Sequence, residues 1–245
     1  MPVRDHYPAA LYAAVHCGNA GDLAFYRQAC AGVRTVLELG CGNGRVGAIV
    51  AASGADVVGL DVNIDALAAA RRRGLACVAA DMRNFCFQQR FERILIPYNG
   101  LYCLLSDDDV VACLSNARRH LAQGGQIIFD GYAVNASARP GARSRRTSST
   151  TQMTTIEVGG RTWDVFEDNV MWPATRRIDA HYRYVPRDGG TTLSAAIRQR
   201  YLAAAEVPAL LSRAGLMLVS LQGGFRGETF TVASEHVVVR AAVSH

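Results

Sequence analysis

The stretch Val36-Leu-Glu38-Leu-Gly40-Cys41-Gly42-Asn43-Gly44-Arg45 decides the fold class of this 245-residue chain. Residues 34–39 form a short β-branched and apolar run that leads directly into three closely spaced glycines. Apolar residues at helical spacing follow over residues 44–52. A strand that feeds a glycine loop at the start of a helix lets the backbone approach a bound nucleotide closely. We therefore expect a nucleotide site at this turn.

The charges around the loop indicate which nucleotide it binds. The third glycine, Gly44, comes one position earlier than in the dinucleotide pattern G-x-G-x-x-G, and Arg45 stands where that pattern needs Gly or Ala. Glu38 would repel a pyrophosphate but would attract a cationic amino group or a sulfonium. Asp61, about 20 residues further on at the end of the next predicted strand, is placed to accept hydrogen bonds from ribose hydroxyls. The loop thus favours S-adenosylmethionine over NAD.

The same residues resemble motif I of the class I S-adenosylmethionine-dependent methyltransferases, E/D-x-G-x-G-x-G, at every specified position. The resemblance covers most of residues 34–131. It implies that the methionine part of the cofactor lies beside the residues Glu38, Gly40, Cys41, Gly42 and Gly44. It also implies that Asp61 contacts the ribose and Val62 the face of the adenine. In the same resemblance Asp81 accepts a hydrogen bond from the adenine amino group, and Met82 donates its backbone N–H to the ring.

Strands and helices alternate along the first part of the chain, which predicts an α/β fold: a Rossmann-like three-layer sandwich with a mostly parallel, seven-stranded sheet. The predicted strands of this part are 34–39, 56–61, 75–80, 91–96 and 126–130, and the predicted helices are 44–52, 64–73 and 107–121. Glycine-punctuated β-rich runs then predict an antiparallel insertion after the fifth strand, with strands near 153–158, 161–170, 176–185 and 191–201. A helix at 207–214 and strands at 216–221 and 236–240 are expected to complete the main sheet.

We expect residues 1–245 to form a single methyltransferase domain with four parts. These are an N-terminal cap segment at 1–33, a cofactor-binding core at 34–138, a loop with the antiparallel insertion at 139–202, and a C-terminal part of the core sheet at 203–245. The basic, small-residue loop 139–150 is interpreted as a mobile lid. Trp163 and Trp172 of the insertion are candidates for a substrate pocket or, alternatively, for the packed face of a hairpin.

The reacting centre is expected at the end of the fourth strand, because open α/β sheets bind ligands outside the carboxyl ends of their strands. The sequence there, Pro97-Tyr98-Asn99, lacks the acidic or amide residue that precedes the prolines in methyltransferases acting on nucleic-acid bases. It is loosely similar to the corresponding loop of amino-sugar N,N-dimethyltransferases. The resemblance implies that Pro97 contacts the cofactor, that Tyr98 and Asn99 align the substrate, and that the N-terminal segment brings Tyr12, His16 and Tyr26 near the methyl group. His16 is then a candidate base.

Composition limits the partners. The net charge is +5 and arginines cluster at 71–73, but no aromatic-rich basic stripe accompanies them, so nucleic-acid binding is not expected. Seven cysteines without a C-x-x-C pair predict buried small residues in a reducing cytoplasm, and no metal site. No apolar run approaches the ~20 residues of a membrane span, and residues 1–6 lack the layout of a signal peptide. We expect a cytoplasmic protein without a membrane partner.

The sequence therefore predicts an enzyme that transfers a methyl group from S-adenosylmethionine to a nitrogen or oxygen of a small metabolite. The alternatives are an RNA or protein methyltransferase, an NAD-dependent oxidoreductase, and a cofactor-binding scaffold without catalysis. Substrate identity and oligomeric state are left open by the sequence.

Overall fold

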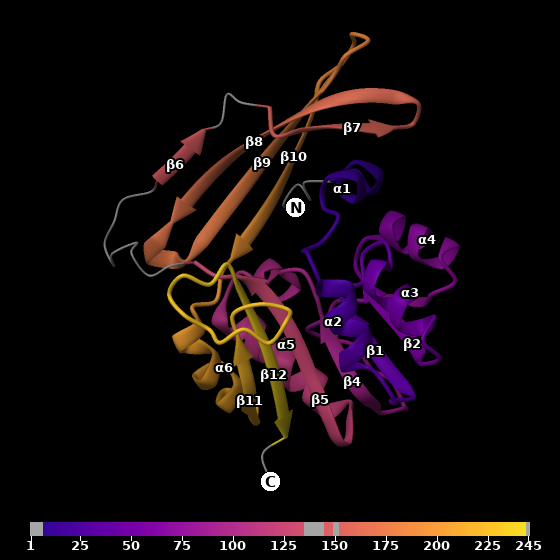
Figure 1. The fold of residues 1–245 in the computed structure, drawn as a ribbon, viewed down its shortest axis with the longest axis vertical. Coiled ribbons are helices and arrows are strands. Elements are labelled where there is room, and N and C mark those ends of the chain that lie inside the picture. The colour runs from indigo at the N-terminus through magenta and orange to yellow at the C-terminus, as the bar shows by residue number, and fades with distance from the viewer. Residues whose placement is uncertain (1–6, 135–144, 149–151, 244–245) are drawn as a thin grey trace. The chain divides into compact units, whose positions relative to one another are not determined.

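The structure is a computed structural model that describes residues 7–134, 145–148 and 152–243 (Figure 1). It divides into two compact units. One comprises Gly18–Ala136 and Tyr201–His245, and the other comprises Met1–Cys17 and Ser137–Arg200. We call the first the nucleotide unit and the second the insertion unit. Within the described ranges, no helix is long and apolar enough to cross a membrane.

The nucleotide unit is built on the predicted seven-stranded sheet, whose strand order is β11-β12-β5-β4-β1-β2-β3. The strands are β1 Thr35–Leu39, β2 Asp56–Asp61, β3 Ala76–Ala79, β4 Phe91–Ile96, β5 Leu121–Tyr132, β11 Leu216–Gln222 and β12 His236–Val243. Neighbours pair in parallel from β3 to β5, whereas β12 pairs antiparallel with both β5 and β11. This order brings the carboxyl ends of β1, β2, β4 and β5 to one edge, as expected of a Rossmann-like sheet.

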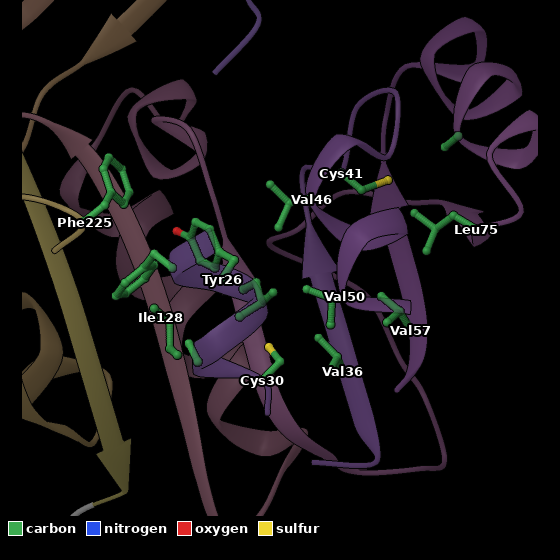
Figure 2. Close-up of a cluster of buried hydrophobic side chains, with 14 of the residues drawn as sticks. Tyr26, Cys30, Val36, Cys41, Val46, Val50, Val57, Leu75, Ile128 and Phe225 are labelled. Atoms are coloured by element: carbon green, nitrogen blue, oxygen red, sulfur yellow. The ribbon is translucent and has the colours of Figure 1, made fainter. Parts of the chain in front are cut away.

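Helices α2 Asp22–Ala29, α3 Arg45–Ala51, α4 Ile64–Arg72, α5 Asp107–Arg119 and α6 Val207–Arg213 accompany this sheet. Side-chain caps mark where two of them begin: Asn63 accepts hydrogen bonds from two backbone N–H groups of α4, and Ser106 accepts one from α5. Apolar side chains of α2, α3 and α4 form one buried cluster with the sheet, in which Tyr26 lies near Ile128 (Figure 2). This cluster holds α2 and α3 close to the end of β1.

The insertion unit contains the predicted antiparallel sheet, in the order β10-β9-β8-β6, with β7 also paired to β8. Its strands are β6 Arg145–Ser148, β7 Thr154–Val158, β8 Arg161–Trp172, β9 Arg177–Pro186 and β10 Leu193–Arg200. The short helix α1 Ala9–Val15 packs against β7. Tyr7 and Leu11 share a buried cluster with Trp163, Tyr182 and Tyr184. Trp163 is thus part of the packed face of the hairpin.

The structure corrects several sequence-based boundaries. The helix predicted over 107–121 ends at Arg119, and β5 begins at Leu121 and continues through Gly124-Gly125. Gly124 adopts a left-handed φ of 72°, and the register of the β4–β5 pair shifts near its start, so the two glycines form an irregularity inside the strand instead of a loop before it. Helices α1 and α2 and strand β6 were not predicted. The remainder of the expected lid, 139–144 and 149–150, lies outside the described residues.

The prediction that the cysteines are buried is wrong for part of the set. Cys30, Cys41 and Cys113 are buried, but Cys17, Cys86 and Cys103 are exposed. Cys17 and Cys86 lie outside helices and strands, and Cys103 is the last residue of the short 3-10 helix Gly100–Cys103. Apolar neighbours in the sequence do not determine on which side of such a segment a thiol lies.

Candidate cofactor and methyl-transfer site

The glycine loop makes a tight turn between β1 and α3. Gly40, Gly42 and Gly44 all have left-handed φ angles, of 70°, 52° and 76°, a region that L side chains rarely occupy. A Cβ on Gly44 would also lie only 3.0 Å from the Cβ of Ala70. The backbone N–H of Cys41 donates to the carbonyl of Leu60 at 2.9 Å, which fastens the loop to β2. The loop therefore presents bare backbone at the carboxyl edge of the sheet.

Asp61 connects the end of β2 to this loop. Its Oδ2 accepts a hydrogen bond from the backbone N–H of Gly42 at 2.7 Å, and its Oδ1 accepts one from the N–H of Asn63 at 2.8 Å. The carboxylate is thereby oriented beside the glycine loop.

Glu38 is buried directly beneath the loop, with only 2% of its surface exposed. Its Oε2 accepts a hydrogen bond from the backbone N–H of Gly47 at 2.8 Å. A Cβ on Gly47 would lie 2.5 Å from that oxygen, so a glycine at this position allows α3 to approach the carboxylate. Burial raises the pKa of Glu38 to about 8, against the opposing effects of this hydrogen bond and of nearby Arg45. A buried carboxylate of this kind is stabilised in its charged form by a cationic ligand.

A cavity of about 310 Å³ lies beside the glycine loop. Its lining combines apolar side chains with acidic ones and comes from Gly40, Leu60, Asp61, Val62, Ala80, Asp81, Met82, Arg83, Cys103, Leu104, Leu105 and Asp109. The residues predicted to surround the adenine, Val62, Asp81 and Met82, are thus brought together with Asp61. The Asp81 carboxylate pairs with Arg83 at 2.6 Å, and this contact is the main reason that its pKa is lowered.

The turn after β4 is locked to β5. Tyr98 and Asn99 both have left-handed φ angles, of 53° and 63°, and a non-glycine residue held there costs of order 1–3 kcal/mol. The backbone N–H of Tyr98 donates to Asp130 Oδ1 at 2.9 Å, and the N–H of Tyr132 donates to Asn99 Oδ1 at 2.8 Å. Two hydrogen bonds to β5 thus hold a strained turn at the strand end where the reacting centre is expected.

Two buried acids of this site were missed from the sequence. Asp130, at the carboxyl end of β5, is 1% exposed, and its Oδ1 also accepts a hydrogen bond from the hydroxyl of Tyr26 at 2.6 Å. Asp22, at the start of α2, pairs with Arg45. An isolated acid that ends the apolar run Ile127-Ile128-Phe129 was the one available sequence signal for Asp130.

The structure assigns the predicted N-terminal site residues to different units. Tyr26 belongs to the nucleotide unit, whereas Tyr12 and His16 belong to the insertion unit. The rings of Tyr12 and His16 have centroids 4.3 Å apart, and His16 Nε2 lies 3.3 Å from the hydroxyl of Tyr7, which also contacts the hydroxyl of Tyr184. Burial lowers the pKa of His16 to about 4, so its imidazole is neutral at pH 7.

Comparisons with known proteins agree with this geometry. Residues 36–125 match the family described as methyltransferase domain. The chain is 28% identical to the cypemycin N-terminal methyltransferase of a Streptomyces species, over 84% of this chain and 82% of that protein. It is 27% identical to the dTDP-3-amino-3,6-dideoxy-alpha-D-glucopyranose N,N-dimethyltransferase of Streptomyces fradiae, over 75% and 73% of the two chains.

Solved structures share the fold. The CcbJ methyltransferase of Streptomyces caelestis superposes with a TM-score of 0.80 at 24% identity, and the match covers 97% of this chain and 98% of that one. Solved neighbours of this fold also include complexes with S-adenosylmethionine.

The fold and the glycine loop thus define a nucleotide-binding α/β enzyme of the methyltransferase class. More specifically, residues 36–125, from β1 to the first part of β5, match a methyltransferase domain, and the chain as a whole is similar to S-adenosylmethionine-dependent methyltransferases. Its residues fit this cofactor, since a buried carboxylate underlies the loop and a cavity adjoins Asp61.

Proposed function

We propose that this enzyme methylates a nitrogen of a small amine, with amino sugars and the free N-termini of peptides as the first candidates. Two named relatives modify nitrogen, one at the N-terminus of a peptide and one on an amino sugar. The observation that carries the cofactor half of the proposal is the buried Glu38 beneath the glycine loop. When bound, S-adenosylmethionine supplies a methyl group on an electrophilic sulfonium.

The protonation state of His16 supports nitrogen over oxygen as the acceptor. A base is most effective when its pKa lies near the working pH, and burial lowers the pKa of His16 to about 4. Such an imidazole is a weak base for a hydroxyl group, whereas an amine that arrives deprotonated needs alignment more than proton removal. Alignment alone contributes up to roughly 7–11 kcal/mol to such a reaction.

We assign the cofactor contacts as follows. Glu38 and the loop residues Gly40, Cys41, Gly42 and Gly44 hold the methionine part, and Asp61 holds the ribose. Val62, Asp81 and Met82 hold the adenine in the cavity. Pro97 and Tyr26 complete the site around the methyl group, while Tyr98 and Asn99 align the substrate. The hydrogen bond from the N–H of Gly42 to Asp61 and the shared cavity lining support the roles of the loop, Asp61 and the residues around the adenine.

We further propose that the two units act together as one methyltransferase domain and that the enzyme works in the cytoplasm. Expression of the nucleotide unit alone, without residues 1–17 and 137–200, tests the first point. Cofactor binding and methyl transfer that both survive would contradict it. Fractionation of cells followed by immunodetection tests the second.

Titration calorimetry tests the proposed function. S-adenosylmethionine and S-adenosylhomocysteine are expected to bind, and NAD is not. A panel of amino sugars and short peptides with free N-termini, incubated with methyl-labelled cofactor, should then yield labelled product. Matched acceptors in which a hydroxyl replaces the amine serve as the control. Faster labelling of the hydroxyl acceptors would show that the nitrogen assignment is wrong.

A further inference from the structure

The Asp130 carboxylate uses only one of its two oxygens. Oδ1 accepts hydrogen bonds from the hydroxyl of Tyr26 and the backbone N–H of Tyr98. Oδ2 is buried and has no hydrogen-bond partner among the described residues. An ionised carboxylate oxygen left in this state is costly, because it has lost its water without gaining a donor. Within the described part of the chain Oδ2 therefore lacks a hydrogen-bond donor, and a ligand is one possible source of that donor.

The surroundings of Asp130 carry an excess of negative charge. Three buried acids, Asp22, Glu38 and Asp130, lie within electrostatic reach of one guanidinium, that of Arg45. Because the pKa of Glu38 is about 8, this acid is largely protonated at pH 7.5 without ligand, and the excess charge comes from the other two. Arg45 is committed to Asp22 through two hydrogen bonds, so Asp130 has no close cationic partner in the part of the chain that the structure describes. A cationic ligand group would balance this charge.

Strand register places Asp130 on the cofactor side of the sheet. Glu38 of β1 is aligned with Leu95 of β4, which is aligned with Ile128 of β5, and Leu95 and Ile128 share one buried cluster. Side chains two residues apart on a strand point to the same face. Asp130 thus lies on the same face as Glu38, two strands away and closer to the carboxyl edge.

We infer that Asp130 binds the ammonium group of the cofactor's amino-acid part through Oδ2, while Oδ1 holds Tyr26 and Tyr98 in place. This inference rests on the proposed function, because it requires S-adenosylmethionine as the ligand. The ligand chemistry follows from the residue: a buried carboxylate oxygen accepts a short, charge-assisted hydrogen bond from an ammonium N–H. Burial raises the pKa of Asp130 to about 6, so the carboxylate is largely ionised at pH 7.5 and ready to accept that bond.

The test is calorimetry at pH 7.5 with three probes: S-adenosylmethionine, S-adenosylhomocysteine and 5′-methylthioadenosine, which lacks the amino-acid part. Asp130→Asn should weaken binding of the first two by roughly 10–100-fold, the range of a lost charge-assisted hydrogen bond. Binding of 5′-methylthioadenosine should change less than about twofold, since that probe carries no ammonium group. Asp164→Asn, an acid of the insertion unit paired with Arg187, is the matched control and should leave all three affinities unchanged.

Each other outcome overturns the inference. Equal losses for all three probes would mean that Asp130 acts only by holding the turn after β4, and unchanged affinities would remove it from the site. If wild-type protein binds none of the probes, the proposed function itself fails, and the inference fails with it. Should Asp130→Asn not fold, Asp130→Glu replaces it. Its longer side chain should weaken the binding of S-adenosylhomocysteine relative to that of 5′-methylthioadenosine. An unchanged ratio of the two affinities would contradict the contact.

Discussion

The Asp22 carboxylate holds the Arg45 guanidinium through two hydrogen bonds, of 2.9 and 2.6 Å. This pair connects the start of α2 to the first residue of α3, immediately after the glycine loop. The guanidinium also lies 5.6 Å from the ring centre of Tyr98. One arginine therefore links the cofactor loop, the N-terminal helix of the nucleotide unit and the turn after β4.

Asp22→Asn should destabilise the protein by about 2–3 kcal/mol, because it leaves a largely buried guanidinium without its charge partner. This loss of stability is smaller than that expected for a fully buried ion pair, because the Arg45 side chain is 18% exposed. Urea unfolding monitored by circular dichroism measures the change. Asp56→Asn, at an exposed acid that begins β2, is the control and should have little effect. A loss no larger than that of the control would mean that the pair does not contribute to stability.

Asp61→Ala should weaken S-adenosylmethionine binding by more than tenfold. The variant loses a charge-assisted contact to the ribose, which contributes roughly 1.5–3 kcal/mol, and it also frees the N–H of Gly42. Calorimetry gives the affinity, and a thermal scan establishes that the variant is folded. Wild-type affinity in a folded variant would remove Asp61 from the ribose site.

Glu38→Gln should change how stability depends on pH in the absence of cofactor. The pKa of Glu38 is about 8 in the folded protein and 4.5 in the reference state. Between these two pKa values the folded protein holds the Glu38 proton more tightly than the unfolded chain does. The stability that this proton contributes is therefore complete below pH 4.5 and is lost as the pH rises to 8. The wild type should therefore lose stability from pH 5.5 to 8.5 more steeply than Glu38→Gln. Melting temperatures of both proteins across this range provide the measurement, and parallel curves would contradict the raised pKa.

Asn99→Ala should lower turnover of order 10–100-fold, about the size of one lost positioning hydrogen bond. It removes the acceptor for the N–H of Tyr132 and leaves an alanine at a φ of 63°. Asn99→Gly tolerates that φ and removes only the hydrogen bond, so it should lose less stability than Asn99→Ala. Cofactor affinity should stay near the wild-type value in both. A fully active Asn99→Ala variant would place the reacting centre elsewhere.

The regular elements of the sheet were predictable because their signals are local. The strand at 91–96 and the helix start at Ile64 follow from the local pattern of apolar residues, and the structure has both at the predicted residues. The glycine loop was equally readable, since three glycines in five positions demand unusual backbone. The sequence predicted that residues 236–240 complete the main sheet, but no local pattern indicates that β12 lies beside β5.

The polar core of the site was not predictable in the same way. Tyr26 and Asp130 form a hydrogen bond although they are 104 residues apart in the sequence. No periodic pattern in the sequence connects two residues at that separation. The left-handed backbone of Tyr98 and Asn99 was also missed, because neither residue is glycine and the conformation is imposed by bonds to β5. Buried hydrogen bonds between distant elements are set by the finished fold, and local propensity carries no information about them.

The antiparallel pairing of β12 with β5 also has a consequence for biosynthesis. Residues 236–241 pair with the second half of β5, from Ile127 to Tyr132. Until they leave the ribosome, β5 is an unpaired edge with the apolar sequence Ile127-Ile128-Phe129, the type of edge to which other chains add. All residues proposed above to contact the cofactor are therefore synthesised well before β12, the strand that completes the sheet beside β5. A chaperone that covers this edge, or a slow supply of the last strand, would decide how much enzyme is formed.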